Sequence, residues 1–134
     1  NGYLYFVDRR KNVIRRSGEN IAALEVEAAL VGASGVLEAI VTAVPDEIRG
    51  EEVAACIVPK TELNIDEQTA NEIVEYTLKT LAYFKVPGYV IFCDALPRTS
   101  SNKPKRADVK SLAKEHLEDG DFFDTRHLKK RAQK

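Results

Sequence analysis

Runs of apolar residues separated by polar turns divide the chain into short strands and helices. Residues 36–44, 53–58 and 89–92 are short apolar runs bounded by Gly, Pro or charged residues, a pattern that predicts strands. Alternation at residues 3–7 predicts a further strand, which we expect to pair with residues 12–14 across the charged turn at 8–11. The polar, glycine-containing stretch at 15–20 predicts a loop.

Helical spacing of apolar residues predicts a first helix at about residues 22–31. Leu24, Ala28 and Val31 fall on one face of it, and Gly32 ends it. Its acidic residues, including Glu25 and Glu27, are suited to the first helical turn because the helix dipole favours negative charge there.

A second, longer helix is expected to begin at Asp66, a suitable N-cap residue, and to run to about Leu81. A short third helix is expected to start near Ala107. The order of these elements predicts an α+β fold, in which a small mixed β-sheet with an N-terminal hairpin is flanked by two to three helices.

The composition describes one ordinary globular domain. The chain has 134 residues, of which 44% are hydrophobic and 31% charged, enough for a modest core. Its net charge of −1 argues against a mainly electrostatic nucleic-acid binder, so we expect no nucleic-acid partner. No stretch approaches the roughly 18 to 20 apolar residues of a transmembrane segment. Because the chain has no Met and opens on a strand-like run, we take it as a piece of a longer protein.

The two cysteines, Cys56 and Cys93, each lie in an apolar run and are expected to be buried free thiols. Two such distant residues make neither a zinc site nor a disulfide framework, so no metal site is expected. This usage favours a reducing compartment, and we expect a cytoplasmic location.

Lys103 is the first candidate for chemistry, because it lies at the tip of a polar turn between a predicted strand and a predicted helix. A flexible cation on a loop can reach carboxylate or phosphate oxygens in a neighbouring site. Taken alone, however, this segment and the arginines near the N-terminus are typical of solvated basic surface.

Four segments together resemble the C-terminal domain of the AMP-forming acyl-CoA synthetases, members of the adenylate-forming superfamily. They are residues 8–21 (DRRKNVIRRSGENI), 44–52 (VPDEIRGEE), 83–87 (YFKVP) and 96–106 (LPRTSSNKPKR). The resemblance covers residues 3 to about 112. Two of the segments look closest to crotonobetaine/carnitine-CoA ligases and related fatty-acid-CoA ligases.

The resemblance implies a mobile lid domain whose larger N-terminal domain belongs to the same polypeptide. Residues 1–11 would then hold the hinge and the preceding strand, 12–117 the mobile domain, and 118–134 a charged, partly frayed tail. ATP and CoA are the implied substrates, with Mg²⁺ accompanying ATP and bound mainly outside this domain. The isolated domain is expected to be inactive.

The resemblance also implies roles for residues of the adenylation step and the hinge. Lys103 would be the catalytic lysine of acyl-adenylate formation. Arg9 would hydrogen-bond the ribose of the nucleotide, and Lys11 would take the hinge position.

A second set of residues would serve the thioester step after the domain rotates. Gly18 would lie beside the pantetheine arm of CoA, where a Cβ would collide. Arg15 and Arg16 would meet the CoA phosphates.

Two alternatives remain open at this point. The domain would act with a carrier protein if the acyl group passes to a phosphopantetheine arm instead of free CoA. It would be a stand-alone interaction module if the basic segment near the N-terminus only binds a partner.

Overall fold

The computed structural model describes residues 13–16, 18–46, 50–60, 64–96 and 106–128. The strand predicted at 3–7, the hinge region at 8–11 and the loop of Lys103 lie outside the described residues.

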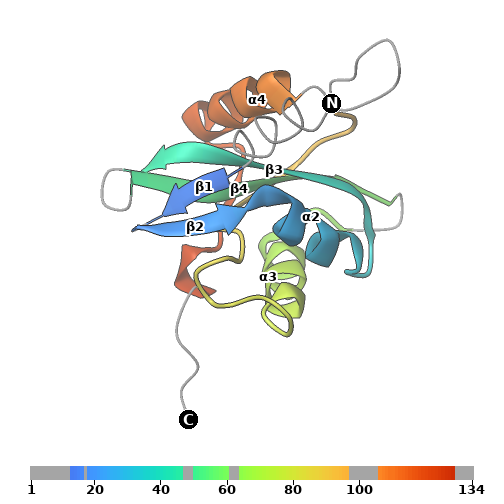
Figure 1. Cartoon of the computed structure of the whole chain (residues 1–134). Coiled ribbons are helices and arrows are strands. Elements are labelled where there is room, and N and C mark those ends of the chain that lie inside the picture. The colour runs from blue at the N-terminus through green and yellow to red at the C-terminus, as the bar shows by residue number, and fades with distance from the viewer. Residues whose placement is uncertain (1–12, 17, 47–49, 61–63, 97–105, 129–134) are drawn as a thin grey trace, which may run out of the picture.

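The described residues form one mixed sheet of six strands with three α-helices, which confirms the α+β prediction (Figure 1). The strands are β1 (Val13–Arg16), β2 (Glu19–Ala22), β3 (Val36–Asp46), β4 (Gly50–Pro59), β5 (Tyr89–Phe92) and β6 (Phe123–Asp124). The helices are α2 (Ala23–Val31), α3 (Glu67–Thr77) and α4 (Arg106–Asp119), followed by a 3₁₀ turn, η1 (Arg126–Leu128).

Strand β4 is the centre of the sheet. It pairs antiparallel with β3 along most of its length and parallel with β5 at 54–57. It also meets β1 antiparallel at a single pair, Arg16 with Gly50. β1 and β2 form the N-terminal hairpin, and β6 adds an antiparallel edge beside β5.

The two faces of the sheet are covered by different helices, so the domain has three layers (Figure 1). Val53, Ala55 and Ile57 of β4 pack in the core shared with α2 and α3. The alternate residues of β4, among them Ala54 and Cys56, pack in the core shared with α4. Because side chains alternate across a strand, a strand covered on both faces is apolar at nearly every position, as β4 is.

The buried face of α2 differs from the predicted stripe. Leu24 and Val31 are 55% and 52% exposed, whereas Val26 and Leu30 are fully buried. The helix is apolar on most of its circumference, so its spacing alone did not determine which side meets the sheet.

Two other elements differ from the boundaries predicted from the sequence. The predicted loop at 15–20 is mostly the β1–β2 hairpin. Asp66 caps α3 as predicted, because its Oδ1 accepts a hydrogen bond of 2.8 Å from the backbone N of Thr69. α3 ends at Thr77, earlier than predicted, and Leu81 follows in the turn region but is still buried.

Both cysteines are free and buried, which confirms that prediction. Within the described part of the chain, no helix is long and apolar enough to cross a membrane. The same residues contain no cluster of three or more His, Cys, Asp or Glu side chains able to hold a metal ion.

Candidate functional site

Gly18 occupies the exposed turn of the β1–β2 hairpin. Arg16 and Glu19 are paired in the ladder on either side of it. Gly18 has a φ of 84°, in the left-handed region that side chains with a Cβ disfavour. A Cβ added here would meet nothing within 4 Å, so the backbone conformation, and not crowding within this domain, favours glycine.

Arg15 and Arg16 point to opposite sides of β1, because successive side chains alternate along a strand. The side chain of Arg15 is exposed, and its backbone N donates a 2.8 Å hydrogen bond to Oε1 of Glu51. Arg16 is only 6% exposed and points into the molecule. Of the two, Arg15 is therefore the one whose guanidinium is presented to a ligand in solvent.

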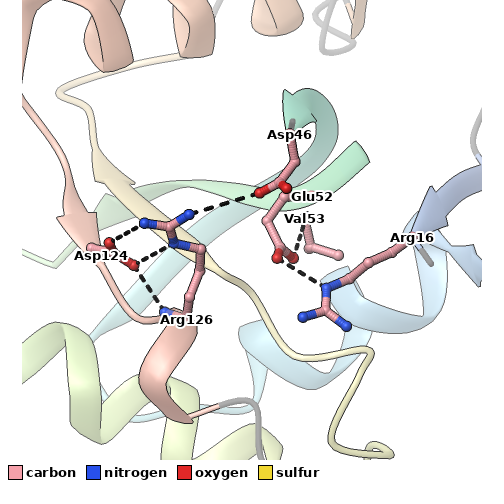
Figure 2. A network of polar contacts seen from close by, with 6 residues as sticks. All are labelled: Arg16, Asp46, Glu52, Val53, Asp124 and Arg126. Carbon is pink, nitrogen blue, oxygen red and sulfur yellow. Dashed lines mark hydrogen bonds and ion pairs between the residues drawn. The ribbon is translucent and has the colours of Figure 1, made fainter. Parts of the chain in front are cut away.

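The guanidinium of Arg16 is bound by the buried carboxylate of Glu52 (Figure 2). Its Nε donates to Oε1 of Glu52 at 2.9 Å, and the side chain of Glu52 is fully buried. The second oxygen of Glu52 accepts a 2.8 Å hydrogen bond from the backbone N of Val53. Buried charges are retained in folded proteins when they are paired and hydrogen-bonded, as both are here.

A second ion pair lies beside this one and secures the C-terminal segment (Figure 2). Arg126 donates to both carboxylate oxygens of Asp124, at 3.0 Å from Nε and 2.7 Å from Nη2. It also reaches Asp46 at the end of β3, with Nη1 3.7 Å from Oδ2, and lies over the ring of Tyr89. The hydrogen bonds from Arg126 hold the pKa of Asp124 below its ordinary value. Burial raises the pKa of Tyr89.

A shallow groove of about 220 Å³ adjoins the hairpin on the side of α4. It is lined by residues of the β3–β4 end, including Gly50 and Glu51, and by Lys110 and Lys114 of α4. Glu51 therefore both holds the backbone of Arg15 and contributes to the wall of this groove.

The structure brings together part of the predicted site. Gly18, Arg15 and Arg16 share the hairpin, while Arg9, Lys11 and Lys103 lie outside the described residues. The sequence did not reveal that Glu51 and Glu52 hold this hairpin. The sequence indicated their importance only through their position in the segment 44–52, which resembles the family pattern.

Comparison with protein families gives a match over residues 25–103 to the family described as AMP-binding enzyme C-terminal domain.

Individual relatives agree with this match. The chain is 42% identical over 111 residues to the mitochondrial acyl-coenzyme A synthetase ACSM3 of Rattus norvegicus, covering 81% of the chain and 19% of the relative. It is 43% identical over 102 residues to the long-chain-fatty-acid–CoA ligase FadD13 of Mycobacterium tuberculosis, covering 76% and 20%.

The fold is also that of a solved enzyme, the o-succinylbenzoate CoA synthetase of Bacillus subtilis in complex with an acyl-adenylate intermediate. The two share 34% identity at a TM-score of 0.67, over 75% of this chain and 20% of that one. The chain thus spans about one fifth of the length of each of these proteins. With most of its length matched by the family pattern and by these relatives, the chain belongs to the AMP-binding enzyme C-terminal domain family of acyl-CoA synthetases and ligases.

Proposed function

We propose that this chain is the C-terminal lid domain of an ATP-dependent, AMP-forming acyl-CoA ligase, with the hairpin of Gly18 lining the CoA channel. The observation that carries the proposal is the hairpin itself, an exposed glycine turn beside an exposed arginine on a firmly held strand pair. The names of the rat and mycobacterial relatives support an acyl-CoA product.

The reaction has two halves. A carboxylate attacks the α-phosphate of ATP, giving acyl-adenylate and pyrophosphate, and the thiol of CoA then attacks the acyl carbon and displaces AMP. ATP is supplied with Mg²⁺, which we place mainly outside this domain. In the proposed cycle the domain rotates about the hinge at Lys11, so that each half-reaction meets a different face.

Lys103 is proposed to act in the first half. Negative charge gathers there from the carboxylate, the α-phosphate and the leaving pyrophosphate, and a preplaced ammonium group orients these anions and stabilises the transition state. Arg9 is proposed to hydrogen-bond the ribose hydroxyls. The expected loss on removing one such charged group is on the order of 10²- to 10³-fold in rate.

The hairpin is proposed to act in the second half. Gly18 has no Cβ and leaves room for the pantetheine arm, and Arg15 has an exposed side chain that can meet the CoA phosphates. Arg16 was expected to do the same, but its guanidinium is buried on Glu52. We therefore give the phosphate contact to Arg15 first.

The acyl substrate is proposed to be a fatty acid, because both relatives named above act on acyl groups and one is named as a long-chain-fatty-acid ligase. Crotonobetaine or carnitine remains the alternative that the segments at 8–21 and 45–52 favour. A cytoplasmic location is likewise a proposal.

The proposal is tested by separating the half-reactions in the full-length enzyme. Lys103→Ala should lower acid-dependent ATP–pyrophosphate exchange by about 10²- to 10³-fold yet still convert supplied acyl-adenylate and CoA to thioester. Gly18→Leu should do the reverse. The exposed Lys60→Ala is a matched control that should change neither half. Equal loss of both halves in Lys103→Ala would sink the role assigned to the lysine.

The thiol acceptor is tested in the same assay. Free CoA should accept the acyl group from the wild-type enzyme, and a holo carrier protein should not. Preference for the carrier protein would replace the CoA ligase by a carrier-dependent adenylating enzyme.

A further inference from the structure

We propose that Arg16 and Glu52 are positioning residues of the thioester half-reaction, because their buried ion pair fixes the orientation of the Gly18 hairpin. This inference rests on the proposed function, since it takes the hairpin as the wall of the CoA channel. It gives a role to two charged residues that are buried within the domain.

The backbone connection between the hairpin and the centre of the sheet is slight. β1 and β4 share one ladder pair, Arg16 with Gly50, and β2 pairs with β1 on the outer side of the sheet. Ile14 and Ile21 anchor the body of the hairpin in the core shared with α2 and α3, so only its turn end can tilt about this pair unless further side chains restrain it.

Two neighbouring glutamates of β4, Glu51 and Glu52, each bind one residue of β1 through their side chains. Glu51 accepts from the backbone N of Arg15, which lies in the plane of the sheet, at 2.8 Å. On the buried face Glu52 accepts from Nε of Arg16 at 2.9 Å. Two successive residues near the turn end of β1 are therefore each held by one of these glutamates, one through its backbone and one through its side chain.

The buried restraint is the stiffer of the two. Glu52 is itself fixed, because its second oxygen accepts from the backbone N of Val53 and its carboxylate packs against Gly88. A hydrogen bond between two desolvated charged groups is electrostatically stronger than one screened by water at the surface. The position of Arg16 is thus set by the centre of the sheet, and Gly18 lies two residues beyond it.

Positioning matters here because the hairpin is used in one half-reaction only. Misplacement of a site element by about 1 Å can lower a rate by about 10²-fold. A tilted hairpin should therefore slow acyl transfer to CoA and leave adenylation, which uses the Lys103 face, unchanged. A purely structural role for the ion pair would instead lower both half-reactions together.

The test uses the full-length enzyme and both half-reaction assays. In Glu52→Gln we expect thioester formation from supplied acyl-adenylate and CoA to fall by about 10²-fold. The rate of ATP–pyrophosphate exchange should be unchanged. Glu115→Gln, an exposed glutamate of α4, is the matched control and should alter neither rate.

A second variant guards against misfolding, because a buried guanidinium without a charged partner destabilises a protein strongly. Arg16→Gln combined with Glu52→Gln leaves no unpaired buried charge, and it should show the same selective loss of thioester formation. Circular dichroism and thermal unfolding identify the folded variants in which the two rates are compared.

The possible outcomes separate this inference from the proposed function. A wild-type enzyme that performs neither half-reaction would overturn the proposed function and the inference with it. A wild-type enzyme that performs both, with a folded double variant that keeps both rates or loses both equally, would overturn the inference alone. Selective loss of thioester formation supports it.

Discussion

Gly88 lies against the buried carboxylate of Glu52 so closely that a Cβ at residue 88 would be 2.6 Å from the Cδ of Glu52. The backbone of Gly88 is held from two sides, since its N donates to Val53 O at 2.8 Å and its O accepts from Thr125 N at 2.9 Å. Neither the glycine nor the glutamate therefore has room to move, and the residue type at 88 decides where the partner of Arg16 sits.

We expect Gly88→Ala to destabilise the domain by about 1–3 kcal/mol, because overpacking a filled interior forces side chains and backbone apart. Urea unfolding of the chain measures this change. In the full-length enzyme the displaced Glu52 should also slow thioester formation more than adenylation.

Gly32→Ala is the control for that substitution. Its Cβ would be 2.9 Å from the hydroxyl of Tyr76, but this side chain is 40% exposed and its tip can move aside. A loss of stability at residue 32 as large as that at residue 88 would contradict the argument from confinement.

At Gly18 the positive φ angle and the open space around the residue can be tested separately by substitution. Gly18→Asn should unfold at nearly the wild-type urea concentration, because Asn tolerates the left-handed region, whereas Gly18→Ala should lose about 1–2 kcal/mol. A Cβ meets nothing in this domain within 4 Å. Any loss of thioester formation in the well-folded Asn variant must therefore come from contact with CoA or another domain. Equal stability of the Asn and Ala variants would disprove the backbone argument.

The general architecture could be predicted from the sequence because short stretches of residues determine most of its elements. The apolar runs of β3, β4 and β5 and the cap of α3 at Asp66 are short-range signals, and each element formed where it was expected. The β1–β2 hairpin was missed because polar residues surround Ser17 and Gly18, so alternation of apolar side chains could not mark its strands.

The buried face of α2 could not be obtained in the same way, because long-range partners decide it. Glu27 was expected to serve the helix dipole, yet it is buried and accepts a 2.8 Å hydrogen bond from the backbone N of Val41. Glu25 lies in the first turn of α2 as expected, and it also pairs with Lys85, with Nζ 3.0 Å from Oε1. No local pattern distinguishes a buried, satisfied carboxylate from a solvated one.

The candidate site also contains one part that short-range signals predict and one part that depends on long-range contacts. Gly18 and the neighbouring arginines could be found from the residues and the family resemblance. The burial of Arg16 on Glu52 could not, because the partners are 36 residues apart and charged residues are normally expected at the surface.

The pair of Asp124 and Arg126 predicts a pH dependence of stability. The pKa of Asp124 is lowered in the folded state by the hydrogen bonds from Arg126. Its contribution is therefore fully present above the ordinary pKa of about 3.9 and is lost as pH falls through the lowered folded value. Asp124→Asn should lose less than about 1 kcal/mol at pH 7, because the pair is partly exposed. The difference from wild type should shrink towards pH 2, and a constant difference in urea unfolding would contradict this.

The buried thiols of Cys56 and Cys93 predict an unequal pair. Hydrogen bonding between the two thiols raises the pKa of Cys56, which burial raises further, and lowers the pKa of Cys93. Alkylation of the folded protein should therefore begin at Cys93, and Cys56 should react only on unfolding.

In Cys56→Ala the hydrogen bond is gone, so the pKa of Cys93 should rise and its alkylation profile should move to higher pH. An unchanged profile in Cys56→Ala would show that the two thiols are not coupled.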